Sequence, residues 1–263
     1  MTKPLRILQI TDTHLYATAD GQLLGLNTLH CLQRVTELAR RGPAPDLVVA
    51  SGDLTHDATE EAYRRLRNCL KDLEAPVYCL PGNHDEAGML KKHLQTPPIH
   101  TTSALIRGQW QLLFLDSTVA GKEGGHLAKP ELAALASSLH EHPDLQTLIF
   151  VHHQPVPIGS SWLDSMAIDN PDKLFAVVDN HPQVRGIVWG HVHQEFDQTR
   201  KNVRLLATPS TCLQFTPQCE TFSVDSLPPG FRWLELHREG RIETGVERLA
   251  EIPGTIDLTS RGY

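Results

Sequence analysis

The segment Ile7-Leu-Gln-Ile-Thr-Asp12-Thr-His14 joins a short apolar run to an aspartate and a histidine that stand two residues apart. Similar runs rich in Val, Ile and Leu recur along the chain and alternate with longer segments of helical periodicity. This alternation predicts an α/β protein, in which helical crossovers separate the strands of a sheet. Because open α/β sheets bind ligands at the carboxyl ends of their strands, Asp12 and His14 occupy an expected site position.

The expected secondary structure follows this periodicity along the whole chain. Strands are predicted at residues 6–11, 46–51, 76–80, 111–116, 147–151, 186–189 and 203–207. Helices are predicted at residues 28–41, 57–73 and 130–139. Residues 231–237 and 241–249, joined by Glu239 and Gly240, are typical of a β-hairpin. No linker or repeat interrupts the pattern, so residues 1–263 are expected to form a single domain.

Composition and charge exclude several classes of protein. The chain has 24 Lys and Arg against 31 Asp and Glu, and its net charge of −7 opposes binding to a phosphate backbone. No segment reaches the roughly 20 apolar residues of a membrane span, and the first apolar run is too short for a secretory signal. Five scattered cysteines without a CxxC pair suit a reducing compartment. We expect a cytoplasmic protein that binds neither nucleic acid nor membranes.

Four later strands end in polar residues, as the first one does. These ends are Gly52-Asp53, Pro81-Gly82-Asn83-His84-Asp85, His152-His153 and Gly190-His191-Val192-His193. Any one of them alone is more often a turn, a helix cap or a core histidine. Five such ends in order, each directly after an apolar run, predict one shared site. The side chains of ligand type in it are Asp12, His14, Asp53, Asn83, His152, His191 and His193.

Seven ligand-type groups exceed the four that a tetrahedral zinc ion takes, so they indicate two metal ions. Oxygen ligands mixed with imidazoles favour Fe, Mn, Zn or Co over Mg or Ca. Two ions about 3.5 to 4 Å apart need a shared ligand, and the two carboxylate oxygens of Asp53 suit that role. A water bridging the ions would lose a proton near neutral pH and act as a hydroxide nucleophile on phosphorus.

The ordered motifs D-x-H, GD, GNHD, HH and GHxH resemble those of the calcineurin-like metallophosphoesterases, over residues 7–193. The resemblance implies a four-layer αββα sandwich with two mixed β-sheets flanked by helices. It also implies one metal ion on Asp12, His14, Asp53 and His193. The second ion is implied on Asp53, Asn83, His152 and His191.

Stretches outside the metal motifs resemble the class III cyclic nucleotide phosphodiesterases, the bacterial 3′,5′-cyclic-AMP phosphodiesterase group. These stretches are residues 24–28, 52–55, 207–215 and 229–234. Phosphatases of the same superfamily carry GDxxDRG, whereas residues 52–58 here lack the arginine, which favours a phosphodiester substrate. The implied function is hydrolysis of 3′,5′-cyclic AMP to 5′-AMP by a metal-bridging hydroxide. The implied partner is this small nucleotide, and the chain is expected as a monomer or homodimer.

His84 is the candidate acid for the departing alkoxide, which leaves poorly without a proton. It follows Asn83 directly, so a metal ion on Asn83 would hold it beside the reacting phosphate. The alternative is that His84 only stabilises the charge of the phosphate. Asp53 and His84 are therefore the expected catalytic residues, and His14, Asn83 and His84 are the expected substrate contacts.

Neighbouring polar residues have simpler expected roles. Asp85 either orients His84 or caps the helix that follows, and capping is preferred. His153 either contacts substrate or donates a hydrogen bond to a carbonyl group and supports the local turn. Asn27 either caps the helix that begins after it or contacts the base or phosphate of a ligand, and capping is preferred. His56 is expected on the solvated surface.

Two further functions stay open from the residues alone. One is a metallophosphodiesterase for another small diester, such as a glycerophosphodiester, a 2′,3′-cyclic nucleotide or a nucleoside diphosphate conjugate. The other is a non-catalytic metal-binding sensor or scaffold with the same fold. The chain contains no GxxxxGK[ST], GxGxxG, GxSxG or HExxH string, so other common catalytic motifs give no competing prediction.

Overall fold

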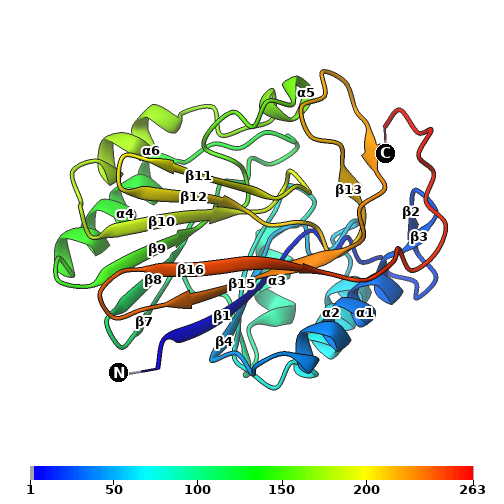
Figure 1. Ribbon diagram of the computed structural model, residues 1–263, viewed down its shortest axis with the longest axis horizontal. Helices are drawn as coiled ribbons and strands as arrows, with labels where there is room; N and C mark the ends of the chain where they lie inside the picture. Colours follow the sequence, from blue (N-terminus) through cyan, green and yellow to red (C-terminus); the bar gives the residue numbers. More distant parts are fainter. Residues whose placement is uncertain (1–2, 263) are drawn as a thin grey trace.

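A computed structural model describes residues 3–262. Two six-stranded β-sheets pack face to face, and helices cover the outer face of each (Figure 1). The first sheet contains, in spatial order, β16 (Ile242–Arg248), β15 (Gly230–Leu236), β1 (Leu5–Ile10), β4 (Leu47–Ser51), β5 (Val77–Leu80) and β6 (Ile99–His100). The second contains β11 (Phe196–Arg200), β12 (Val203–Ala207), β10 (Val184–Trp189), β9 (Gln146–Phe150), β8 (Trp110–Phe114) and β7 (Ala104–Arg107).

Six helices and two short ribbons complete the described chain. The helices are α1 (Thr28–Arg41), α2 (Glu60–Lys71), α3 (Ala87–Leu94), α4 (Lys129–Glu141), α5 (Ser161–Asp164) and α6 (Pro171–Val178). The two-stranded ribbons pair β2 (Gln22–Leu23) with β3 (Leu26–Asn27) and β13 (Gln214–Phe215) with β14 (Val224–Asp225). No helix within residues 3–262 combines the length and the apolar character that crossing a bilayer requires.

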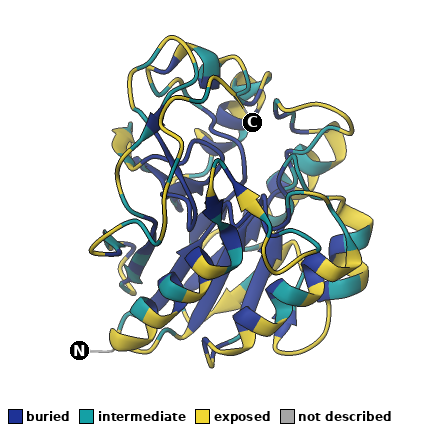
Figure 2. Cartoon of the chain, turned by 90° about the vertical axis from the view of Figure 1, so that its right-hand side faces the viewer, coloured by how far each residue is buried: buried dark blue, intermediate teal, exposed yellow. Residues whose placement is uncertain are grey.

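Three buried apolar clusters hold the layers together. The central cluster joins Ile7 and Val49 of the first sheet with Phe150 and Val188 of the second. A second cluster packs α1, α2 and α3 against the first sheet, and a third packs α4, α5 and α6 against the other. Figure 2 shows the buried strands inside and the exposed outer faces of the helices. The fold is the four-layer αββα sandwich of two mixed sheets that the resemblance implies.

Parallel pairing brings the polar strand ends to one edge of the sandwich. β1, β4 and β5 run parallel in the first sheet, and β9 and β10 run parallel in the second. Each of these five strands is buried along nearly its whole length, which explains its mainly apolar sequence. The loops that follow them therefore meet at the same edge.

Most predicted boundaries agree with the structure to within one or two residues. The predicted helix over residues 28–41 is α1 itself, and Asn27 caps it by accepting a hydrogen bond from the His30 N–H over 2.7 Å. The helix predicted from residue 57 begins only at Glu60. Asp57 instead accepts a hydrogen bond from the Thr59 hydroxyl, and Thr59 is the residue that caps α2.

Candidate metal centre

The predicted ligands lie in loops with an unusual backbone conformation. Asp12, His14, Asp53, His191 and His193 all have positive φ angles, between 44° and 63°. Residues other than glycine seldom adopt this conformation, and its energetic cost is tolerated mainly where the surrounding structure fixes it for a function. Five strained positions among seven predicted ligands mark this edge of the sheets as a functional site.

Main-chain hydrogen bonds hold the loops of the first sheet side by side. The Asp12 N–H donates to the Gly52 carbonyl over 3.0 Å, and the His14 N–H donates to the Asp53 carbonyl over 2.9 Å. The third loop joins them through the His84 N–H, which donates to Asp53 Oδ1 over 2.9 Å. Asp53 is therefore at the centre of all three loops.

Glycines in two motifs are required by close approach of the chain. A Cβ atom on Gly82 would overlap the backbone nitrogen and the carboxylate of Asp53. A Cβ atom on Gly190 would overlap the hydroxyl of Thr11 and lie 2.8 Å from Asp12 Oδ2. Both glycines thus let loops from different strands come together around the carboxylates.

One group of predicted ligands gathers around Asp12. Nε2 of His193 lies 3.4 Å from Asp12 Oδ1 and 3.3 Å from Nε2 of His14. Nδ1 of His193 is 2.9 Å from the Leu213 carbonyl oxygen, to which it donates when protonated. This contact orients the ring so that Nε2 points toward the other ligands of the group, as is typical of histidines that bind metal ions.

A second group gathers around His152. Its Nε2 lies 3.4 Å from Asp53 Oδ2 and 3.2 Å from Asn83 Oδ1, and its Nδ1 is held 2.9 Å from the Ser51 carbonyl oxygen. Asp53 Oδ2 also lies 3.9 Å from Nε2 of His14 in the first group. Asp53 is thus the carboxylate between the two groups, where a bridging ligand is expected.

His191 completes the set with an unsatisfied nitrogen. Its main-chain N–H donates to both oxygens of Asp12 at 3.1 Å, and its ring centroid is 5.2 Å from that of His152. Its buried Nε2 makes no hydrogen bond with any residue between 3 and 262. An unpaired buried nitrogen is costly. A metal ion would satisfy it, so the residues present fit the metals that the motifs imply.

The electrostatics of the site also suit bound cations. Burial lowers the pKa of His14 and of His191 well below the usual value, so both rings are neutral and have a lone pair available. Burial acts to raise the pKa of Asp53, yet the neighbouring His152, His84 and His14 hold it well below its usual value. Burial acts to lower the pKa of His152, but Asp53 raises it to about 9. A proton on His152 thus offsets the buried carboxylate, a role that a cation would take over.

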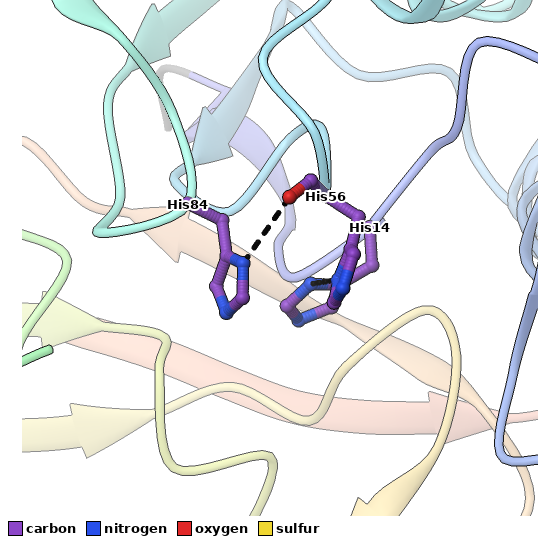
Figure 3. A group of neighbouring side chains, drawn as sticks. All are labelled: His14, His56 and His84. Atoms are coloured by element: carbon purple, nitrogen blue, oxygen red, sulfur yellow. Dashed lines mark hydrogen bonds between the residues drawn. The ribbon is translucent and has the colours of Figure 1, made fainter. Parts of the chain in front are cut away.

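His56 belongs to the site, and its prediction as solvated surface is wrong. Its Nδ1 lies 3.4 Å from Nδ1 of His14, and its ring stacks on that of His84 (Figure 3). Burial, together with the neighbouring His84, lowers the pKa of His56 to about 4. The available signal was its position three residues after Asp53, on the same loop.

Of the two roles predicted for His153, the structure shows the supporting one, in which its ring holds the local turn. Its Nδ1 lies 2.8 Å from Oγ of Ser117, and its Nε2 lies 3.0 Å from the carbonyl oxygen of Glu123. Burial, together with the neighbouring His152, lowers the pKa of His153 to about 3. The ring therefore ties the loop after β8 to the loop after β9.

Asp85 does not cap the following helix, contrary to the preferred prediction. Helix α3 begins at Ala87, and its cap is Glu86, which accepts hydrogen bonds from the main-chain N–H groups of Gly88 and Met89. Asp85 lies one residue too early to reach those groups. Its carboxylate instead accepts hydrogen bonds from Leu54, Thr55, Tyr63 and Gly82. Asp85 thereby fixes the loop after β4 against the loop after β5.

A cavity of about 520 Å³ opens beside the predicted ligands. Asp53, Asn83, His84 and His191 line the part of it next to the two groups. The volume is within the usual range for small-molecule sites in proteins. The arrangement can therefore present a small ligand to polar side chains that converge from both sheets.

Comparison with known proteins places this site in a family context. Residues 5–195 match the model of the calcineurin-like phosphoesterases. The chain is 42% identical over 261 residues to the 3′,5′-cyclic adenosine monophosphate phosphodiesterase CpdA of Escherichia coli K12, across 98% of this chain and 95% of that protein. It is 39% identical to CpdA of Pseudomonas aeruginosa, across 98% of this chain and 94% of that protein. It is 40% identical to a 3′,5′-cyclic-nucleotide phosphodiesterase of Nostoc, across 94% and 93%.

Solved structures share the fold at much lower sequence identity. A dimetal phosphatase from Danio rerio matches with a TM-score of 0.65 at 15% identity, across 94% of this chain and 99% of that one. The purple acid phosphatase PPD1 from yellow lupin matches with a TM-score of 0.65 at 13% identity, across 98% and 53%. These two likenesses concern the arrangement of sheets and helices alone.

Proposed function

The chain belongs to the calcineurin-like phosphoesterase family, and on that premise we propose that it hydrolyses 3′,5′-cyclic AMP to 5′-AMP. The observation that carries the proposal is the meeting of seven ligand-type side chains from both sheets beside a cavity of about 520 Å³. The relatives named for this activity match nearly the whole chain, including the segments beyond the metal motifs. The missing arginine of the phosphatase motif also favours a diester over a monoester.

The two groups of ligands would hold one divalent metal ion each. We assign the first ion to Asp12, His14, Asp53 and His193, and the second to Asp53, Asn83, His152 and His191. The unpaired Nε2 of His191 and the carbonyl-bound Nδ1 atoms of His152 and His193 support the assignment. When bound, two such ions, Fe or Mn with Zn or Co as alternatives, would polarise the phosphate and lower the pKa of an attacking water.

The protein's own residues have separate tasks in the reaction. The oxygen of water forms a new bond to phosphorus and the water releases a proton to the solvent, while the bond between phosphorus and the 3′ oxygen breaks and that oxygen takes up a proton. His84 lines the cavity and is fixed by its main-chain bond to Asp53, so we assign it as the proton donor. His14 and Asn83 would contact the phosphate beside it.

The proposal also covers the domain organisation, the location and the assembly of the protein. Residues 1–263 would act as one domain, because the ligands of each ion come from both sheets. A cytoplasmic location is supported by five cysteines that form no disulfide among residues 3–262. The cyclic nucleotide is the proposed small-molecule partner, and the chain would act as a monomer or homodimer.

A substrate panel with metal analysis on the same sample tests the proposal. The metal-loaded protein is assayed with 3′,5′-cyclic AMP, 3′,5′-cyclic GMP, 2′,3′-cyclic AMP, glycerophosphocholine and ADP-ribose. We expect about two ions per chain and fastest hydrolysis of a 3′,5′-cyclic nucleotide. If cyclic AMP stayed intact while another diester was cleaved rapidly, the assigned substrate would be wrong. If Asn83→Ala and His84→Ala both kept full activity, the assigned site would be wrong.

A further inference from the structure

The cavity has an aromatic wall in addition to its polar part. Trp162, Phe215 and Phe222 line it together with Met166. The Trp162 ring meets Phe215 at a centroid distance of 4.9 Å and an angle of 79°, and it meets Phe222 at 5.2 Å and 65°. These edge-to-face contacts are the favoured geometry of aromatic pairs, so the three rings support one another.

This aromatic wall begins directly at the candidate metal centre. The Phe215 ring stacks on His193 with centroids 4.3 Å apart and 17° between the planes. Phe215 itself is buried, whereas Trp162 and Phe222 are only partly buried. Phe215 therefore acts as the support, and Trp162 and Phe222 present ring surface to the cavity.

Hydrogen bonds fix the position of Trp162 relative to the metal centre. Its helix α5 and the ribbon strand β13 lie at the same end of the molecule (Figure 1). The carboxylate of Asp164 accepts hydrogen bonds from the main-chain N–H groups of Ile158 and Gly159, at 2.8 and 3.1 Å. The Leu163 carbonyl accepts a hydrogen bond of 2.7 Å from Gln154, in the loop that carries His152.

Apolar and aromatic packing orients the Trp162 ring. The buried indole N–H makes no hydrogen bond with any residue in the range 3–262. The wall therefore offers a ligand an uncharged π surface, next to a centre suited to phosphate. A nucleotide combines these two chemistries, because its base is a flat, uncharged ring system joined to a phosphate through ribose.

We propose that Trp162 and Phe222 form the subsite for the nucleobase, which stacks on the Trp162 ring with its edge against Phe222 while the cyclic phosphate lies at Asp53 and His84. This inference rests on the proposed function and adds the residues that recognise the base. Stacking of a base on an aromatic side chain contributes roughly 5- to 150-fold in affinity and tolerates any base. The larger purines gain more contact area from such a wall than pyrimidines do.

Kinetics with and without a base on the substrate test the subsite. The control substrate is 1-O-methylribose 3′,5′-cyclic phosphate, which keeps the reacting group and replaces the base with a methoxy group. We expect Trp162→Ala to raise KM for cyclic AMP about tenfold or more, with kcat/KM for the methyl riboside changed less than about twofold. Trp162→Phe keeps a ring and restores most of the affinity. Equal losses on both substrates, or an unchanged KM for cyclic AMP, would overturn the proposal.

A binding measurement separates this proposal from the proposed activity. Adenosine, which has no phosphate, is titrated against intrinsic tryptophan fluorescence. We expect quenching in the parent protein and in Trp233→Phe, which alters a tryptophan outside the cavity lining, but not in Trp162→Phe. If quenching depended on Trp162 but the protein cleaved no cyclic nucleotide, the base subsite would be supported and the proposed activity would be wrong. Quenching that persisted in Trp162→Phe would exclude the subsite.

Discussion

The imidazole rings of His84 and His56 stack with their centroids 4.7 Å apart and 26° between their planes. Nδ1 of His84 also lies 3.4 Å from the main-chain carbonyl oxygen of His56. The ring of His14 meets His84 edge-on at 4.9 Å, so the proposed acid lies beside two other histidines in a cluster of three rings (Figure 3). His56 thus supports His84 through its backbone and through its ring.

Removing the His56 ring separates these two forms of support. His56→Ala keeps the carbonyl oxygen but loses the stacking, which for an aromatic pair is worth about 0.5 to 1.5 kcal/mol. We expect kcat for cyclic AMP to fall roughly 2- to 12-fold with little change in KM. His56→Phe restores a ring and is the control. A phenylalanine variant as slow as the alanine variant would show that stacking is not what positions His84.

The leaving group decides which of two roles His84 has. A 3′ alkoxide needs a proton as it departs, whereas p-nitrophenolate leaves without one. If His84 is the acid, His84→Ala lowers kcat for cyclic AMP by about 10² to 10⁴ and lowers hydrolysis of bis(p-nitrophenyl) phosphate much less. Equal losses on the two substrates would instead assign His84 to charge stabilisation.

Metal ions that bind only the folded protein should stabilise it. One site filled at 100 times its dissociation constant adds about 2.7 kcal/mol, or roughly 5 to 10 °C in Tm for a chain of this size. We expect Mn²⁺ to raise Tm and a chelator to reverse the rise, as measured by differential scanning fluorimetry. Asp53→Asn weakens both proposed sites and should lose most of the shift.

The matched control for the metal experiment is a surface carboxylate outside the proposed metal centre. Asp179 pairs with Arg200 and Lys201 and is not one of the predicted ligands. Asp179→Asn should therefore keep the full metal-dependent rise in Tm. A shift of the same size in Asp53→Asn would place the stabilising ions outside the proposed centre.

The fold was largely predictable because its strands are buried on both faces. β1, β4 and β9 are rich in Val, Ile and Leu, and their ends agree with the predicted ones to within one or two residues. The β2–β3 and β13–β14 ribbons were missed, since strands of two residues are too short to show any periodicity. The exposed strand β11 was also missed, because it lacks an apolar run.

The candidate site was predictable where a motif directly follows a strand. The backbone then fixes the position of the side chain, as it does for Asp53 after β4. The aromatic wall follows from contacts between distant segments instead. Trp162 and Phe222 are separated by a long stretch of chain, and no local pattern indicates that their rings meet. Such pairings depend on how loops fold back, which periodicity does not encode.

The contacts of Asp85 predict a strong effect on stability from a residue outside the proposed ligands. Its carboxylate accepts hydrogen bonds from the main-chain N–H groups of Leu54 and Thr55 at 3.0 and 3.1 Å. Both of these residues are fully buried, so their N–H groups would find no water if the carboxylate were removed. We expect Asp85→Ala to lower the free energy of unfolding by about 3 to 5 kcal/mol in urea denaturation.

Glu86→Ala is the matched control, because it removes the neighbouring carboxylate and leaves the loop contacts in place. Glu86 caps α3 by accepting hydrogen bonds from Gly88 and Met89, and the loss of a cap costs about 1 kcal/mol. Asp85→Ala should also lower activity, since the loops it joins carry Asp53 and Asn83. A cost for Asp85→Ala no larger than that for Glu86→Ala would mean that the loop after β4 holds its shape without this carboxylate.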